Sequence, residues 1–313
     1  MNSTPPQEDL NRDLGLGSRV TQQSRQRFLN RDGSFNVTRH GHSFFRAMSP
    51  YHWMLSMSWT MFNFLVVAAY LFTNVLFAFG YLLCGASALH GAVGISIPER
   101  YLEAFFFSVQ TLATIGYGVM SPQGLAANIL VSIEALFGLL GFALATGLLF
   151  ARFSRPSAKI IFSKHAIIAP YREITAFEFR IVNQRSSQLI GVEANVVLAR
   201  NEDVRGIVTR KFYPLKLERE KVMFFPLHWV VVHPIDALSP LYGVTKEILD
   251  ASDAEFLIVL TGVDEIFSQT VHSRSSYKHA EVVWNARFAD MFDASNKHEV
   301  SIDLRKLDDL EQL

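Results

Sequence analysis

The stretch Thr111-Leu112-Ala113-Thr114-Ile115-Gly116-Tyr117-Gly118 decides the fold, because it closes an apolar segment too short to cross a membrane. Residues from Tyr101 to Ile115 are mostly apolar, whereas a spanning helix needs about 20 such residues. A segment this apolar does not suit a solvated loop, so we expect a helix at about 103–113 that enters the membrane and turns back. Gly116 and Gly118 can adopt the positive φ that residues with a Cβ resist, which predicts irregular backbone after this helix.

Two long apolar segments flank this stretch. From Ala47 to Pro98 the chain has no Asp, Glu, Lys or Arg, and the part from Trp53 to Cys84 is almost wholly apolar and aromatic. The second segment, Leu125 to Phe150, carries a single charge at Glu134. Both are long enough to cross a hydrocarbon layer of about 30 Å. The sequence therefore predicts two spanning helices with the re-entrant helix between them.

Basic residues predict the orientation of these spans. They precede the first span and follow the second at Arg12, Arg19, Arg25, Arg27, Arg31, Arg39, Arg46, Arg152, Arg155, Lys159 and Lys164. Because cytoplasmic flanks are rich in Lys and Arg, we expect both ends of the chain in the cytoplasm. The N-terminal part has no apolar signal-peptide region, so targeting is expected to come from the spans themselves.

The loop from Thr114 to Gly118 predicts a cation site built from backbone oxygens. A potassium ion gives up its water only for fixed oxygens that face one axis, and the two glycines permit a backbone that points successive carbonyls the same way. In this interpretation Thr114, Ile115, Gly116 and Tyr117 supply the ligands for K⁺. The side chains of Ile115 and Tyr117 point away from the axis. One chain encloses no pore, so four copies are expected around it.

Composition and the rest of the chain restrict the function further. The formal net charge is zero, which gives no field that would attract nucleic acid, and the lone Cys84 allows no internal disulfide. After Pro156 apolar residues alternate, as in 176–181 and 192–196, which predicts many short strands and a β-sandwich. No nucleophile–base pair, phosphate-binding glycine loop or cluster of metal ligands stands out. We therefore expect no enzyme, no cofactor and no small-molecule substrate, and we expect the scattered histidines to be structural.

The chain resembles the inward-rectifier potassium channels, and within them most closely the prokaryotic branch called KirBac. The resemblance is carried by five motifs in order, namely residues 104–118, 150–156, 162–168, 233–243 and 274–277. The segment 162–168 looks like the first strand of the family's cytoplasmic domain. The resemblance implies an immunoglobulin-like β-sandwich, a homotetramer in a bacterial inner membrane, and regulation by anionic lipids. It also implies a potassium pathway that continues through the cytoplasmic assembly.

Two positions depart from the pattern of eukaryotic relatives. These carry a Glu and an Arg that pair behind the filter, where this chain has Gln110 and Met120. Relatives that rectify strongly have an acidic residue part-way along the inner helix, where this chain has Phe142. Filter support is therefore expected from Gln110 without an ion pair, and strong polyamine block at Phe142 is not expected.

The inner helix holds Gly138, Phe142, Thr146 and Phe150 at intervals of four, which places them on one stripe. Four copies of Phe150 would close an apolar constriction, with Phe142 as a second ring; the alternative is packing against helices or lipid. Gly147 and Gly138 are candidate hinges, although small residues also permit close helix packing.

Further polar and aromatic residues lie along and beside the spans. Glu134 either lines the cavity or supports the filter from behind. Arg152, Arg155, Lys159 and Lys164 are candidate ligands of anionic head groups, although plain topology would also place cations there. Before the first span, residues 40–51 predict a short interfacial helix with Phe44, Phe45, Met48 and Tyr51 at helical spacing.

These features divide the chain into a cytoplasmic N-terminus (1–53), a first span (54–84), an outer loop with pore helix and filter (85–124), an inner helix (125–154) and a cytoplasmic domain (155–313). A non-selective channel would need a degraded filter, whereas Thr114–Gly118 is intact. A membrane-anchored β domain would leave the re-entrant segment without a purpose. The sequence therefore predicts a potassium-selective channel gated at the cytoplasmic end of the inner helix.

Overall fold

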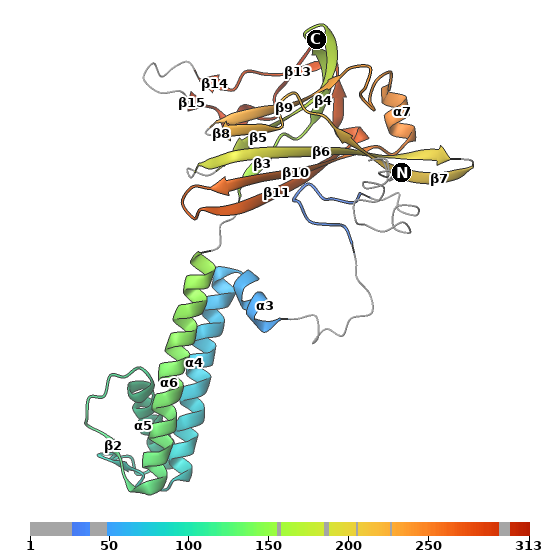
Figure 1. Cartoon of the computed structure of the whole chain (residues 1–313). Coiled ribbons are helices and arrows are strands. Elements are labelled where there is room, and N and C mark those ends of the chain that lie inside the picture. The colour runs from blue at the N-terminus through green and yellow to red at the C-terminus, as the bar shows by residue number, and fades with distance from the viewer. Residues whose placement is uncertain are drawn as a thin grey trace, which may run out of the picture. The chain divides into compact units, whose positions relative to one another are not determined.

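The computed structural model describes residues 27–37, 49–154, 158–184, 188–204, 206–225, 227–293 and 301–313. The chain divides into two compact units (Figure 1). One is His40–Arg155, called the helical unit below. The other combines Met1–Arg39 with Pro156–Leu313 and is called the β unit. Each unit is described by itself.

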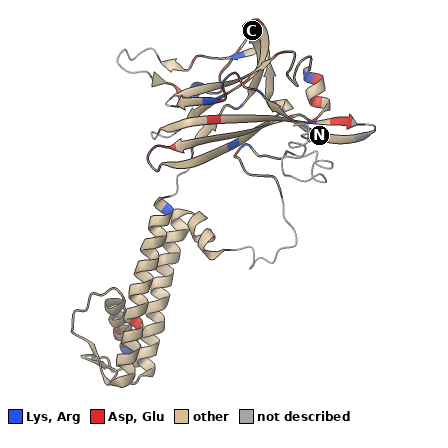
Figure 2. Cartoon of the chain, viewed as in Figure 1, with Lys and Arg blue, Asp and Glu red and all other residues tan. Residues whose placement is uncertain are grey.

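The helical unit, in its described part, is built from α3 (Pro50–Ser56), α4 (Trp59–Leu83), α5 (Ile97–Leu112) and α6 (Gly124–Phe153). Both α4 and α6 are long and apolar enough to cross a membrane. Figure 2 shows that they are almost free of charged side chains. The loops on either side of α5 are tied together by β1 (Leu89–His90), which pairs antiparallel with β2 (Ser121–Pro122).

The first long helix begins at Trp59, later than the predicted position 54. Met57 and Ser58 are extended, with ψ of 162° and 155°, and they separate α4 from the short helix α3. The Ser58 side chain accepts a hydrogen bond from the N–H of Met61 and so caps the new helix. Hydropathy alone did not reveal this break. The predicted interfacial helix falls mostly on residues outside the described part, including Phe44, Phe45 and Met48, while Tyr51 lies in α3.

Helix α5 starts at Ile97, before the predicted position 103. Ser96 caps it by accepting from the N–H of Glu99, and the Glu99 carboxylate accepts from the N–H of Ser96 at 3.0 Å. Pro98 lies in the first turn, where its missing N–H costs nothing. This reciprocal cap is readable in the sequence as Ser-x-x-Glu and fixes the true start of the helix.

Two five-stranded sheets form the described part of the β unit. The first has the order β11-β10-β6-β7, with β8 also paired to β6, and consists of β6 (Leu189–Val204), β7 (Ile207–Leu215), β8 (Lys221–Phe224), β10 (Glu255–Asp264) and β11 (Gln269–Lys278). The second has the order β12-β4-β5-β3, with β9 also paired to β5, and consists of β3 (Ile160–Phe162), β4 (Ala166–Tyr171), β5 (Ile174–Asn183), β9 (His228–Ile235) and β12 (Val282–Trp284). Pairing is antiparallel except between β12 and β4.

Shorter elements complete the β unit. They are α7 (Lys246–Ala251), the 3₁₀ turns η1 (His279–Glu281) and η2 (Leu304–Lys306), and the pairs β13 (Ala286–Phe288) with β16 (Leu310–Gln312) and β14 (Phe292–Asp293) with β15 (Ser301–Ile302).

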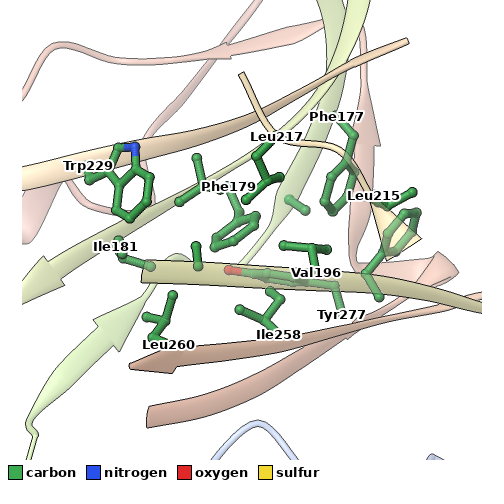
Figure 3. Close-up of a cluster of buried hydrophobic side chains, with 14 of the residues drawn as sticks. Phe177, Phe179, Ile181, Val196, Leu215, Leu217, Trp229, Ile258, Leu260 and Tyr277 are labelled. Atoms are coloured by element: carbon green, nitrogen blue, oxygen red, sulfur yellow. The ribbon is translucent and has the colours of Figure 1, made fainter. Parts of the chain in front are cut away.

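Both sheets contribute to one apolar core, shown in Figure 3. Phe177, Phe179 and Ile181 alternate along β5 and are fully buried, as the period-two pattern predicts. From the other sheet, Phe256 stacks on Phe177 with ring centroids 4.0 Å apart. Apolar faces that meet in this way make a β-sandwich, which agrees with the predicted strand-rich domain.

The segment 162–168 is not one strand, contrary to expectation. Strand β3 ends at Phe162 and β4 begins at Ala166. Between them Ser163 is fully buried, and its Oγ donates to the carbonyl of His165 at 2.8 Å. Tyr277 in turn donates its hydroxyl proton to the Ser163 carbonyl at 2.8 Å. A buried side chain that bonds its own backbone turns the chain here, and so divides the stretch between two strands.

Residues 27–37 pack on the β unit although they precede the helical unit in sequence. Phe28 and Leu29 are buried, and their N–H groups donate to the buried carboxylate of Glu255 at 3.1 Å and 3.3 Å. Arg27 forms an ion pair with Glu281 at 3.1 Å and donates to Ser276. The N-terminal segment is therefore part of the β unit by packing as well as by hydrogen bonding.

Candidate functional site

The loop after α5 has the backbone that the sequence predicts for a filter. φ is +57° at Thr114, +59° at Gly116 and +77° at Gly118, whereas it is not positive at the two residues between them. In an ordinary strand the carbonyls alternate between two sides. When the sign of φ alternates instead, each peptide plane is turned so that successive carbonyls can face one side. The loop is thus suited to presenting a row of oxygens to a cation.

Thr114 is predicted in this row from the sequence, but its positive φ is not. A β-branched residue rarely adopts positive φ, and such strain persists only where the surroundings hold it. The N–H of Thr114 donates to the carbonyl of Thr111 at 3.0 Å, and the N–H of Ile115 donates to the carbonyl of Gln110 at 2.8 Å. The end of α5 therefore fixes the loop. Gln110 takes part, but through its backbone carbonyl.

The glycines are required by backbone conformation rather than by crowding within one chain. A Cβ built on Gly116 or Gly118 would meet no atom within 4 Å. The neighbouring side chains are also open, with Ile115 47% and Tyr117 72% exposed. In a single chain these two side chains are thus largely uncovered.

A buried polar cluster behind α5 joins the three longest helices. The Tyr81 hydroxyl of α4 donates to one carboxyl oxygen of Glu134 in α6, and Ser108 of α5 contacts the other. Ser108 is also hydrogen-bonded to Asn74 of α4 at 3.0 Å. All four side chains are at most 1% exposed. Of the two roles left open for Glu134, the buried position supports the second, which is to hold the pore helix from behind.

Gly138, one turn further along α6, contacts the end of α5. A Cβ at this position would lie 2.8 Å from the carbonyl oxygen of Leu112. A Cβ at Gly147 or Gly141 would meet no atom within 4 Å. Gly138 therefore permits close packing of α6 on the pore helix, and of the two candidate hinges Gly147 is the one free of such contacts.

The predicted gate residues lie on a face of α6 that the single chain leaves uncovered. Phe142 is 76% and Phe150 73% exposed. The residues that are buried near this end, Leu148 and Arg152, each lie two positions from Phe150, about 200° around a helix. One face of the helix end is thus packed within the chain, and the opposite face presents the phenylalanine.

Comparison with known proteins identifies the family. Residues 160–313 match the family described as inward rectifier potassium channel C-terminal domain, and residues 64–155 match the family described as ion channel. The chain is 42% identical over 288 residues to inward rectifier potassium channel Kirbac3.1 of Paramagnetospirillum magnetotacticum, covering 91% of this chain and 96% of the relative. The chain belongs to the inward rectifier potassium channel family.

More distant inward rectifiers match as well. Human inward rectifier potassium channel 4 is 30% identical over 63% of this chain and 47% of its own length. Mouse G protein-activated inward rectifier potassium channel 3 is 27% identical over 85% of this chain and 73% of its own. These relatives are ion channels and not enzymes, in agreement with the sequence analysis.

The four basic residues predicted to bind lipid in this inward rectifier have different environments. Arg152 is only 9% exposed and donates to the carbonyls of Met54 and Met57 at 2.5 Å and 2.7 Å. Its two Nη donors are therefore engaged with backbone carbonyls within the helical unit. Lys159 and Lys164 are exposed, while Arg155 lies outside the described residues. Two of the four thus remain open to a head group in the described chain.

His233 in the β unit of the inward rectifier has the contacts of a structural histidine. His233 is buried, and its ring nitrogens lie 2.6 Å from the Lys216 carbonyl and 2.7 Å from Ser239 Oγ. Burial lowers the pKa of His233. Asp236 caps the following turn through the N–H of Leu238. Among the described residues no group of three or more His, Cys, Asp or Glu could hold a metal ion.

Proposed function

We propose that four copies of this chain form a potassium-selective channel, with backbone oxygens of Thr114, Ile115, Gly116 and Tyr117 as the ion ligands and Gly118 closing the loop. The alternation of φ sign from Thr114 to Gly118 carries this proposal, since it supplies carbonyls that face one side. K⁺ is the permeant ion, and the channel needs no cofactor. An intact filter argues against a non-selective pore.

The homotetramer follows from what one chain lacks. Irregular backbone at membrane depth is tolerated only where it lines water or protein, and one loop with two spans encloses neither. The open surroundings of Ile115 and Tyr117 provide the surface that neighbouring copies would cover. In this arrangement α5 is re-entrant, and its negative C-terminal end stabilises a cation in the central cavity.

The gate is assigned to the cytoplasmic end of α6. Four copies of Phe150 around the axis would form an apolar constriction that closes by excluding water, and Phe142 would form a second ring two turns away. Their exposure of 73% and 76% in a single chain supports this assignment. Gly147, which has no contact that a Cβ would disturb, is the proposed hinge.

Both ends of the chain are assigned to the cytoplasm, with the β unit (155–313) as the regulatory domain and the bacterial inner membrane as the location. Exposed Lys159 and Lys164, together with Arg155, are the proposed ligands of anionic lipid head groups. Such juxtamembrane cations attract anionic lipid by about 1 kcal/mol each. We place the domain limits at 54, 85, 125 and 155. The two long helices start near two of these limits, at Trp59 and Gly124.

Radioactive rubidium uptake into liposomes that hold the purified protein tests the channel function. Barium-sensitive, cation-selective uptake is expected from the wild type, whereas a membrane-anchored binding domain or an enzyme would give none. Gly116→Ala should abolish this uptake while the tetramer still assembles, because Ala at a φ of +59° is strained and its methyl group perturbs the carbonyl row. Wild-type uptake in this variant would refute the filter assignment.

A further inference from the structure

The far end of the filter loop contacts residues 89–94, called the linking segment below, which lie between α4 and α5. Gly118 is followed by Val119, whose carbonyl oxygen lies directly against Gly91. A Cβ built on Gly91 would clash with this oxygen, while the carbonyl carbon is farther away at 3.3 Å, so the carbonyl is directed at Gly91. Gly91 also has a φ of +83°, which residues with a Cβ resist. Only glycine therefore fits this position, for two independent reasons.

The pairing of β1 with β2 holds Gly91 in this place. Next to the paired residues, the N–H of Gln123 donates to the carbonyl of Ala88 at 2.8 Å. Leu89 of the linking segment is buried in an apolar cluster with side chains of α4 and α5, and Met120 packs against the same cluster. Residues on both sides of the contact are thus anchored in the core of the helical unit, so the contact at Gly91 is fixed from both sides.

The linking segment is also fixed to the start of the pore helix. The carboxyl group of Glu103 accepts from the N–H groups of Val93 and Gly94, both at 3.0 Å. Nε of Arg100 donates to the carbonyl of Gly94 at 3.0 Å, and a Cβ on Gly94 would lie 2.9 Å from the Cβ of Glu99. These three partners belong to the first two turns of α5. The linking segment therefore connects the far end of the filter loop to the start of the helix whose other end holds the near end.

These contacts give the filter loop a support at each end. The end of α5 fixes Thr114, and the linking segment fixes the residue that follows Gly118. Selectivity depends on how the carbonyl dipoles of the row are arranged, so a displacement at one end alters the sites along it. We propose that Gly91 is a positioning residue for ion selectivity. It receives the Val119 carbonyl, which is directed at the linking segment, and so fixes where the row of oxygens ends. This inference rests on the proposed channel function.

A matched pair of alanine substitutions separates the contact from backbone strain. Gly91→Ala pushes a methyl group onto the Val119 carbonyl, whereas Gly124→Ala carries similar strain, at a φ of +79°, and meets no atom within 4 Å. Uptake of radioactive rubidium and of radioactive sodium, and the barium concentration that halves rubidium uptake, are measured for the full-length protein in liposomes. Gly91→Ala should lower rubidium over sodium selectivity by about tenfold, which corresponds to about 1.4 kcal/mol, and should weaken barium block. Gly124→Ala should match the wild type in both.

A second pair of variants decides the question if Gly91→Ala does not assemble. Glu103→Ala removes the acceptor that holds the linking segment on α5 and should lower selectivity in the same direction. Glu103→Gln keeps one acceptor oxygen for both N–H groups and should restore it. Wild-type selectivity and barium block in an assembled Gly91→Ala tetramer, or in Glu103→Ala, would overturn the inference, since a purely structural role would lower thermal stability alone. An equal loss of selectivity in Gly124→Ala would overturn it too. Absence of barium-sensitive uptake in the wild type would instead refute the proposed channel function.

Discussion

The two halves of α6 each bury one ionisable side chain, but they do so in different ways. Glu134 lies among hydroxyl and amide groups of α4 and α5, in a cluster that joins three helices. Arg152 lies between rings and carbonyls at a single corner, and the opposite face of its turn is uncovered. The first half is held from several directions near the filter. The second is held on one side only, opposite the exposed Phe150 of the proposed gate.

Removing the carboxyl group of Glu134 should cause the largest loss of stability. Glu134→Ala leaves the buried groups of Tyr81 and Ser108 without their partner and opens a cavity, which should cost about 3–5 kcal/mol of tetramer stability. Thermal unfolding in detergent, with rubidium selectivity as a second readout, measures this. The matched control Glu134→Gln keeps the size and one acceptor oxygen, and its NH2 group can donate to the second hydroxyl once that hydroxyl turns. A Gln variant as damaged as the Ala variant would therefore contradict the role assigned to the cluster.

A pair of glycine substitutions tests whether the first half is more tightly packed than the second. Gly138→Ala would place a methyl group 2.8 Å from the Leu112 carbonyl oxygen and should destabilise the protein by about 1–3 kcal/mol. Gly147→Ala meets no atom within 4 Å, so its stability should change by less than about 1 kcal/mol. Its effect should appear in open probability instead. Equal stability losses in thermal unfolding would remove the distinction between the two halves.

A smaller loss of stability is expected when a single hydroxyl group of the polar cluster is removed. Tyr81→Phe removes one hydroxyl group and keeps the edge-on ring contact with Phe107 at 5.2 Å. One lost hydrogen bond to a buried carboxyl group predicts a loss of about 1–2 kcal/mol. Tyr51→Phe serves as the control, because Tyr51 is 58% exposed. Identical unfolding midpoints for the two variants would show that the hydroxyl of Tyr81 contributes nothing.

The sequence predicts those features that depend on local pattern. Charge-free length predicts both spans, the glycine spacing predicts the filter loop, and alternation predicts the strands of the sandwich. The cap formed by Ser96 and Glu99 is also a local pattern, and it would have predicted the start of α5 at Ile97 instead of 103. In contrast, Glu134 stood out as a buried charge, but its partners Ser108 and Tyr81 lie 26 and 53 residues away, and only the packing of three helices selects them.

Arg152 is a second residue whose partners cannot be predicted from local sequence. A cation at the end of a span satisfies the positive-inside pattern whether it binds lipid or protein. Its true partners, the carbonyls of Met54 and Met57, carry no signal in their side chains and lie 98 and 95 residues away. The positive φ of Thr114 was equally hidden, because a β-branched residue is the last choice for such a conformation on local grounds.

The packing of residues 27–37 on the β unit makes the helical unit an insertion into another folded body. The chain leaves the β unit once to form the helices and then returns to it. Both ends of the helical unit are therefore covalently joined to the β unit. Phe28 and Leu29, held by the carboxylate of Glu255, would keep the N-terminal piece attached after a protease cut in 38–48. Both pieces should then co-purify under native conditions and separate only in denaturant. The first and the last helix of the helical unit thus both lead, along the chain, to the same folded body.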